Sequence, residues 1–521
     1  MPKFIPYDYN QNSMVVINYL DQLQPGTFEH AIHHLIDKKL DLSVFYPKFE
    51  NEETGRPAYD PAILLKIILF AYSRGVTSSR EIEWCCQSNI IFKALSCDTV
   101  PHFTTIAGFV SNSAEEIENL FEQILLICDE QGLLGHELFA IDGCKIPSNA
   151  SKEWSGTFKE LEHKRVKINH QIHYHLNQHQ NLDKHDSRGE ERRRRSEQAV
   201  ETLNKSFERI DHFLKSHSPR MGQGKIKKEV KSNITDNESA KMTTSKGTIQ
   251  GYNGLATVDK KHQIIIDAQV FGEGQEHHTL LPILESIEAR YQGLKTDKTI
   301  YKNEIIITAD TGFANEANMK YLQENKINGY IPDNKFRIRD PKFTKQKSKY
   351  GKRRQSNTKK TSKMIPPSDF NFDPASKTCI CPAGKSMWIN HEGNDREGHT
   401  KIFFEGRISK CRHCEIKKQC MRNPSSANQR KGHGRMVSFI LERHQKVSHT
   451  DWMKYRVDSP KGKQIYSHRM SVVEPVFGNI GTNKGLNRFS LRGKRKVQGQ
   501  WQLYCMVHNI EKIKNYGQIA A

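Results

Sequence analysis

An apolar run between Glu304 and Asp310 constrains the fold more than any other feature of the sequence. Residues 305–309 read Ile-Ile-Ile-Thr-Ala, without the polar alternation of a strand that faces water on one side. A run this short and apolar is typical of a central strand buried on both faces. The fold must therefore cover the sheet from both sides.

The segments around this run follow an order typical of a mixed sheet. Further strands are expected at 138–141, 251–258, 263–270 and 329–332. Helices are expected at 279–291 and 315–324, and a last helix begins near 495. The succession strand, strand, strand, helix, strand, helix, strand predicts an α/β fold with a mixed sheet.

The chain before this sheet, residues 1–135, is expected to be helical. Pro61 heads the apolar segment Ala62–Phe70 in the first-turn position that proline tolerates, and Gly75 can end that helix. Short helices with glycine-containing turns suit a DNA-binding domain. A dimerisation or packing domain fits the same pattern.

A charged helical insertion is expected at 154–216. Its second half carries apolar residues at helical spacing, namely Leu203, Phe207, Ile210 and Leu214. Matching positions earlier in the segment predict a helical hairpin. The run Arg192–Arg195 could touch phosphate, but glutamates surround it, and a solvated helix face is the better interpretation.

The charge of the chain points to a polyanionic partner. Lys and Arg number 80 against 59 Asp and Glu, a formal net charge of +21. Neutralising phosphates releases counterions, so this excess favours nucleic acid. No signal peptide is visible, and the most apolar run, 62–72, contains Lys66 and is too short to span a bilayer. We therefore expect a soluble intracellular protein.

Three acidic residues stand at predicted strand and helix ends. Asp142 and Asp310 each follow an apolar strand, where neighbouring strand ends can bring carboxylates together. Glu474 precedes Pro475, so we expect it at a helix start. Carboxylates bind hard cations such as Mg²⁺, and two such ions can activate an attacking oxygen and stabilise a leaving one. An Asp-Gly pair is also an ordinary turn, so spacing alone does not establish this triad.

The motifs around these acids resemble those of insertion-sequence DDE transposases. The matching segments, in chain order, are Gly55–Pro61, Ser79–Ile82, Asp142–Gly143, Asn233–Asp236, Gly251–Asn253, Ala309–Phe313, Val473–Gly478, Arg488–Gly493, Lys496–Val497 and His508–Asn509. The resemblance implies an RNase H-like catalytic core over 136–334 plus 464–521. It also implies that Asp142, Asp310 and Glu474 hold two Mg²⁺ or Mn²⁺ ions.

The same resemblance implies a reaction and its partners. Such an enzyme cleaves double-stranded DNA at the terminal inverted repeats of a transposon and joins the freed 3′-hydroxyl to target DNA. The N-terminal helices would recognise the repeats, a homodimer would form on DNA, and the protein would lie in the bacterial cytoplasm, on the nucleoid when bound. Alternatives are an RNase H-like nuclease without strand transfer, a catalytically decayed or domesticated DNA-binding protein, and a basic RNA-binding protein.

Members of this family carry a Tyr-Arg-Glu-Lys signature around the third acid. Tyr466 and Arg469 fit its first half, while Glu474 lies one residue beyond the commonest spacing. The position of the lysine holds Gly481, and Lys484 is the nearest substitute. The resemblance implies contacts to phosphate or DNA from Tyr466, Arg469, Lys484, Arg488, Arg492 and Lys496, and from the basic stretch 335–354.

A cysteine-bearing insertion is expected at 335–463. Four of the eleven cysteines offer thiolates for a structural Zn²⁺ ion, namely Cys381, Cys411, Cys414 and Cys420. The resemblance extends to a branch of the family with a similar insertion. Cys379 and His413 are alternative ligands, and a set of free buried thiols is the alternative without metal.

Overall fold

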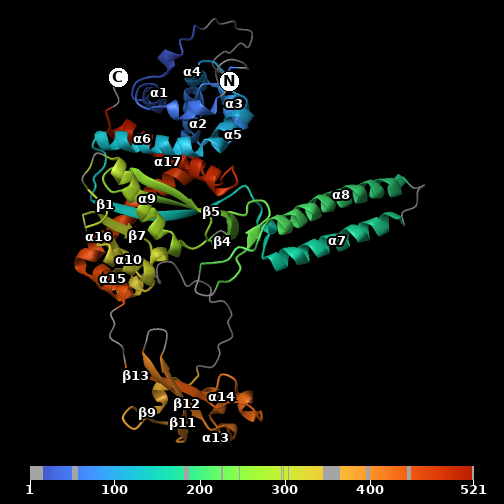
Figure 1. The fold of residues 1–521 in the computed structure, drawn as a ribbon, viewed down its shortest axis with the longest axis vertical. Helices are drawn as coiled ribbons and strands as arrows, with labels where there is room; N and C mark the ends of the chain where they lie inside the picture. The colour runs from blue at the N-terminus through green and yellow to red at the C-terminus, as the bar shows by residue number, and fades with distance from the viewer. Residues whose placement is uncertain are drawn as a thin grey trace, which may run out of the picture. The chain divides into compact units, whose positions relative to one another are not determined.

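We describe a computed structural model of the chain, which divides into two compact units (Figure 1). Unit 1 comprises Met1–Phe336 and Trp452–Ala521, and unit 2 comprises Arg337–Asp451. The structure describes residues 16–49, 57–180, 187–223, 227–245, 247–294, 296, 298–302, 304–343, 364–394, 399–442 and 448–518. None of the helices found there has both the length and the apolar character needed to cross a bilayer.

Unit 1 is built on a mixed sheet, which confirms the predicted α/β class. Strands β1 (Leu138–Pro147), β7 (Ile306–Ala309) and β8 (Asn328–Tyr330) run parallel in that order. On the other side of β1 lies β5 (Gly247–Asp259), antiparallel to it, and β5 also pairs with β4 (Ala240–Thr244) and β6 (Ile265–Phe271). Ile305, Ile307 and Ala309 have no exposed surface, as the apolar run predicts.

Helix α17 (Lys494–Tyr516) packs along the sheet, on β6 (Figure 1). Trp501 donates from its indole Nε1 to the Leu255 carbonyl at 3.0 Å, and Asn509 pairs with both backbone groups of Ile265. Gly254 makes room for the indole, because a Cβ there would lie 3.3 Å from the ring. Further helices are α9 (Leu280–Gly293), α10 (Glu316–Glu324), α11 (Phe336–Arg339), α15 (His449–Asp458) and α16 (Pro460–Gly478).

The segment before β1 is helical and packs on the other side of α17 (Figure 1). Its helices are α1 (Phe28–Lys38), α2 (Pro61–Ser73), α3 (Ser79–Ser88), α4 (Ile90–Ser96), α5 (Phe103–Asn112) and α6 (Ala114–Glu130). Pro61 begins α2 as predicted, and the Asp60 carboxylate caps it by accepting from the Ala62 N–H at 2.8 Å. The rings of Tyr72 and Tyr504 stack at 4.3 Å, which joins α2 to α17.

Two long helices, α7 (Phe158–Gln180) and α8 (Ser187–Ser216), pack against each other. Their shared core contains Leu161, Ile168 and Ile210, and the apolar stripe of α8 faces it. At the base of the pair, β2 (Ser155–Gly156) and β3 (Ser232–Asn233) form a short antiparallel ladder. The two helices therefore have a small core of their own.

Unit 2 contains an antiparallel sheet with small helices. Its strands, in the order of their pairing, are β9 (Asn371–Asp373), β10 (Thr378–Ile380), β11 (Ser386–Asn394), β12 (Thr400–Gly406) and β13 (Met436–Glu442). Helices α13 (Ile408–Arg412) and α14 (Lys417–Cys420) follow β12. Phe370, Ile402 and Phe404 are among the residues of its apolar core.

Candidate active site

The register of the central parallel strands brings Asp142 and Asp310 side by side. Pairing between β1 and β7 ends at Ile141 and Ala309, so each aspartate occupies the next position on its strand. Adjacent strands lie about 4.8 Å apart, which places the two residues within reach of one common partner. The expectation that Asp142 follows its strand is wrong. Strand β1 continues to Pro147, because β5 still pairs with it where β7 has ended.

Arg469 of α16 is that common partner. Its Nη1 lies 2.7 Å from Asp142 Oδ2, and its Nη2 lies 3.6 Å from Asp310 Oδ1. Burial lowers the pKa of Arg469, but the nearby negative charges, first of all Asp142, outweigh burial and raise it. Burial raises the pKa of Asp142 in spite of Arg469, whose charge lowers it. The single guanidinium therefore does not fully compensate the desolvation of Asp142.

Glu276 is a third acid at this site, and the sequence analysis missed it. It begins a short 3-10 helix, Glu276–His278, between β6 and α9. Asn253 of β5 donates from Nδ2 to Glu276 Oε1 at 3.1 Å. Burial raises the pKa of Glu276; the Asn253 hydrogen bond lowers it, and the charges of Asp142 and Asp310 raise it further. In the sequence, the only indication of a third acid was indirect. Gly143 follows Asp142, and Gly312 lies two residues after Asp310, so small residues leave space beside both aspartates.

Gly312 makes room for the Glu276 carboxylate, whereas Gly143 makes room first of all for the side chains of Leu255 and Asn253. A Cβ on Gly312 would collide with Oε2, and a Cβ on Gly143 would lie 3.3 Å from Oε1. The Glu276 carboxylate therefore lies beside the backbone of the residues that follow Asp142 and Asp310. Among the described residues, no group of three His, Cys, Asp or Glu is arranged closely enough to hold an ion, and this applies to the acids around Arg469 and to the cysteines of unit 2 alike.

The structure does not bring Glu474 into contact with this group. Glu474 is exposed, and it lies five helical positions beyond Arg469, a rotation of about 140° around α16. Val473, which is fully buried, occupies the position one turn beyond Arg469. The expected helix start is also wrong, because Pro475 lies inside α16 near its end. Proline leaves the Ser471 carbonyl without a helical donor, and Gln263 Nε2 donates to that carbonyl at 3.0 Å instead.

The basic residues of the predicted DNA contact divide into buried and exposed groups. Lys484 is 1% exposed and forms an ion pair with Glu511, and burial lowers its pKa. Tyr466 lies against Arg469, with the guanidinium 5.8 Å from its ring centre. By contrast, the side chains of Arg488, Arg492 and Lys496 are exposed. Of these six side chains, only Arg488, Arg492 and Lys496 present positive charge to solvent. In the predicted basic stretch 335–354, Lys335, Arg337 and Lys342 are exposed too, and residues 344–354 lie outside the described part of the chain.

The exposed group is anchored at the far end of β1. Arg488 Nε donates to the Ser148 carbonyl at 3.2 Å, and Arg492 Nε donates to the Asn149 carbonyl. The Asn149 side chain in turn donates to the Ser490 carbonyl at 3.1 Å. The loop after β1 and the segment before α17 therefore hold each other in place.

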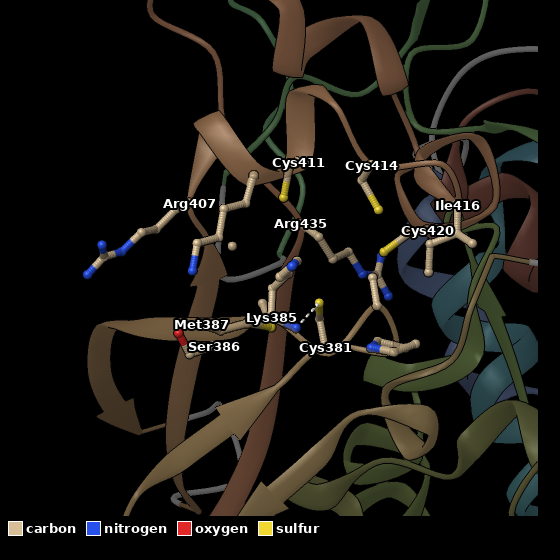
Figure 2. A pocket seen from close by; sticks show the side chains of 14 residues that line it. Cys381, Lys385, Ser386, Met387, Arg407, Cys411, Cys414, Ile416, Cys420 and Arg435 are labelled. Carbon is tan, nitrogen blue, oxygen red and sulfur yellow. Dashed lines mark hydrogen bonds between the residues drawn. The ribbon is translucent and has the colours of Figure 1, made fainter.

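Four cysteines line one pocket in unit 2, namely Cys381, Cys411, Cys414 and Cys420, and their sulfur atoms face it (Figure 2). Two glycines leave space for the Cys411 thiol: a Cβ on Gly406 would lie 2.8 Å from its Sγ, and a Cβ on Gly434 would lie 3.3 Å from it. The Lys385 N–H donates to Cys381 Sγ at 3.4 Å. Burial raises the pKa of Cys420; Arg435 lowers it, and the other three cysteines raise it.

The two alternative zinc ligands lie elsewhere. Cys379 belongs to the apolar core of unit 2, with its Sγ 3.8 Å from Met387 Sδ. His413 is exposed and is not among the residues that line the pocket. The described part of unit 2 therefore gathers the four cysteines that the spacing selected.

Comparison with known protein families gives two matches, each to one part of the chain. Residues 18–112 match the family described as a transposase domain (DUF772), which places the N-terminal helices among transposase sequences. Residues 380–514 match the family described as a transposase DDE domain. Together the two matches indicate an insertion-sequence DDE transposase, a class that implies DNA binding. Neither match includes Asp142, Asp310 or Glu276, and no curated protein matches the sequence.

Proposed function

We propose that the chain is a DNA transposase that cleaves at the ends of its element and transfers the 3′-hydroxyl strand into target DNA. The observation that carries this proposal is the register of β1 and β7, which sets Asp142 and Asp310 next to each other beneath Arg469. Carboxylates held in this way suit phosphoryl transfer, where catalysis depends on positioning and on charge stabilisation.

The sheet supports an RNase H-like core. In chain order the strands are β1, β5, β6, β7 and β8, and the ladder runs β6-β5-β1-β7-β8 with β5 antiparallel to β1. Asp142 lies on the central strand of this ladder, β1, and Asp310 immediately follows the neighbouring strand β7. A rigid central position suits a catalytic pair, because small displacements of reacting groups are costly.

The carboxylates are ligands of the kind that divalent cations prefer, although as they stand they are not close enough together to hold an ion. Asp142 and Asp310 would hold Mg²⁺ or Mn²⁺ together with a third acid, for which Glu474 is the candidate from sequence. Bound ions would stabilise charge on the attacking and leaving oxygens of the phosphodiester. The fit rests on hard oxygen donors and on the raised pKa of Asp142, whose buried charge lacks full compensation.

The side chains around the pair have separate tasks. Arg469 holds both aspartates in position and adds positive charge where a phosphate would approach. Exposed Arg488, Arg492 and Lys496 contact the DNA backbone, and the N-terminal helices recognise the terminal inverted repeats. Lys484 would have to leave Glu511 to reach a phosphate. Two DNA ends require two such sites, so we propose a homodimer on DNA.

The cysteine pocket of unit 2 would hold a structural Zn²⁺ ion. Four thiolates satisfy its tetrahedral preference and leave no open position for catalysis. The Lys385 N–H at Cys381 Sγ is the kind of hydrogen bond that orients a metal-bound thiolate. Cys381, Cys411, Cys414 and Cys420 would therefore stabilise the fold of unit 2.

A strand-transfer assay tests the proposed function. The chain is incubated with Mg²⁺, a pre-cut DNA end carrying a 3′-hydroxyl and a target plasmid. Joined product is expected from the native chain and from Asp21→Asn, a control at an exposed acid. Asp142→Asn and Asp310→Asn should bind DNA but give no joined product.

Other outcomes identify the alternatives. Cleavage without joining would indicate a nuclease, and end-specific binding without either reaction would indicate a decayed transposase. Binding without preference for DNA ends would favour a general nucleic-acid-binding protein. Joining by the two asparagine variants at native rates would refute the site.

A further inference from the structure

The solvent-facing side of α7 has no acidic residue after Glu162. Helix α7 packs on α8, beside which it lies in Figure 1, through Leu161, Ile168 and Ile172. Residues 163–178 contain no Asp or Glu, although 59 of the 521 residues of the chain are acidic. The exposed side chains opposite the shared core lie at helical spacing, namely His163, Val166, Lys167, His170, Tyr174 and Asn177. Every polar side chain among them can donate a hydrogen bond, so this side suits an anionic partner rich in acceptors.

Two cations of this side, Lys159 and Lys167, have no acidic partner among the described residues. The acids of the same helix, Glu160 and Glu162, are each held by another cation. On α8, by contrast, an acid four residues away in the helix pairs with each of Arg193, Arg195, Lys205 and Lys215. The outer side of α7 therefore presents positive charge that no acid of its own helix neutralises.

The base of these two helices continues the proposed DNA contact. The backbone carbonyls that hold Arg488 and Arg492 belong to the loop between β1 and α7. Further along this loop, Lys241 of β4 donates from Nζ to the Lys152 carbonyl at 3.3 Å. Lys164 of α7 donates to the next carbonyl along the chain at 2.6 Å. Cations therefore follow the chain from the proposed contact to the first turns of α7.

Two buried residues, Asn233 and Asp236, join the base of the helices to the start of α17. Asn233 has no exposed surface and donates from Nδ2 to the Ser151 carbonyl at 2.8 Å. The Asp236 carboxylate, in a side chain that is 4% exposed, accepts from the Gly493 N–H at 3.3 Å, next to Arg492. Breaking buried hydrogen bonds of this kind is costly, so the two cationic segments stay connected.

We infer that the outer side of α7 is a second DNA-binding surface, which tracks the phosphate backbone of the duplex beyond the part contacted by Arg488, Arg492 and Lys496. This inference takes its partner, DNA, from the proposed function. Positive charge, hydrogen-bond donors and continuity with the proposed contact are what a phosphate backbone requires. From Lys159 to Asn177 the helix rises about 27 Å, the length of about eight base pairs. A second copy of the chain suits this side less, because the same side of two chains would set lysines against lysines.

The salt dependence of DNA binding by the full chain tests this inference. Fluorescence anisotropy gives the affinity for a duplex that carries an element end and its flanks, at several KCl concentrations. Each lost phosphate contact should reduce the slope of log affinity against log salt by about 0.9. The double variant Lys159→Gln/Lys167→Gln should therefore lose about 1.8 in slope and at least about 10-fold in affinity at about 0.1 M salt. The matched control Lys205→Gln/Lys215→Gln removes the same charge from ion pairs on α8, and its affinity should stay within about twofold of the native value.

A second measurement changes the DNA instead of the protein. The duplex is shortened from each end in turn, in steps of about eight base pairs. At one of the two ends, the native chain should lose as much slope as the double variant lost on the full-length duplex. On that shorter duplex the double variant should lose nothing further, because the contact has already been removed.

The outcomes separate this inference from the proposed function. An unchanged slope in the double variant, or an equal loss in the α8 control, would overturn the inference alone if the native chain transfers strands. An unchanged slope together with a loss of dimers in sedimentation would assign this side of α7 to a second copy and overturn the inference as well. The expected loss of slope in a chain that transfers no strand would support the surface and refute the proposed function.

Discussion

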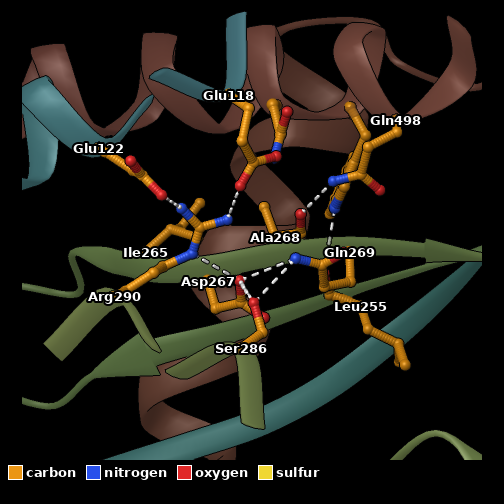
Figure 3. A network of polar contacts seen from close by, with 12 residues as sticks. Glu118, Glu122, Leu255, Ile265, Asp267, Ala268, Gln269, Ser286, Arg290 and Gln498 are labelled. Atoms are coloured by element: carbon orange, nitrogen blue, oxygen red, sulfur yellow. Dashed lines mark hydrogen bonds and ion pairs between the residues drawn. The ribbon is translucent and has the colours of Figure 1, made fainter. Parts of the chain in front are cut away.

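Arg290 forms the most buried ion-pair network in the described part of unit 1 that links the sheet to the N-terminal helices (Figure 3). Its side chain is 3% exposed, and its Nε lies 2.8 Å from Asp267 Oδ1, itself 2% exposed. Its two Nη atoms reach Glu118 and Glu122 on α6. Arg290→Met keeps the apolar stem and removes the charge, which leaves Asp267 buried without a cation.

The structure sets the size of this effect. Breaking a fully buried pair costs about 3 to 5 kcal/mol of stability. Ser286 and Gln269 still donate to Asp267, so we expect the lower end, about 3 kcal/mol. Arg495→Met is a matched control. Arg495 pairs at 2.8 Å with Glu115, which lies on α6 like Glu118 and Glu122, but the side chains of Arg495 and Glu115 are both exposed. That change should cost less than about 1 kcal/mol.

Urea unfolding together with hydrogen exchange of α6, α9 and β6 measures both variants. Arg290→Met should lower the protection of these elements together, whereas Arg495→Met controls for the loss of an exposed arginine pair. Adding Asp267→Asn to Arg290→Met should recover part of the loss, because the unpaired buried charge is removed. Equal stability of Arg290→Met and Arg495→Met would refute the reasoning.

Three further predictions concern other parts of the chain. Lys484→Met should cost about 1 to 3 kcal/mol of stability, because it leaves Glu511 without its ion-pair partner. DNA affinity at fixed salt should stay within about twofold of the native value. A large loss of affinity in a folded variant would show that Lys484 reaches DNA. Cys411→Ser should abolish zinc binding, measured by metal analysis of the purified chain. The control Cys97→Ser, at an exposed cysteine, should keep the native zinc content. Equal zinc content in the two variants would reject the site. Burial lowers the pKa of His508 to about 3, so the unfolded chain binds a proton there between pH 6.5 and 3 that the folded chain does not. The buried, neutral His508 therefore contributes stability that is fully present above pH 6.5 and is lost as pH falls, by about 2 kcal/mol at pH 5. His508→Gln should flatten this part of the dependence of unfolding free energy on pH.

The sequence predicted the elements whose pattern is local. The apolar run 305–309 identified a buried central strand, and Pro61 marked the start of α2. Asp142 and Asp310 were also within reach of sequence reasoning, because each follows an apolar segment and parallel strands set such positions side by side. Their contact with Arg469 depends on how α16 packs, which no local pattern gives.

The errors have physical causes of the same kind. Glu276 lies in a turn without periodicity, and only the fold brings that turn against Gly143 of β1 and the segment after β7. Glu474 was expected at a helix start because proline usually breaks a helix interior. Here Gln263, distant in sequence, satisfies the carbonyl that Pro475 leaves free, so α16 continues.

The most direct test of the account locates the bound ion on the chain. Fe²⁺ replaces Mg²⁺ in the full-length protein, and ascorbate with peroxide generates radicals that cut the backbone next to the ion. We predict cuts near Asp142, Glu276 and Asp310, all suppressed by excess Mg²⁺ and by Asp142→Asn. Cuts confined to other segments, including the one around Glu474, would contradict a metal site between the two aspartates.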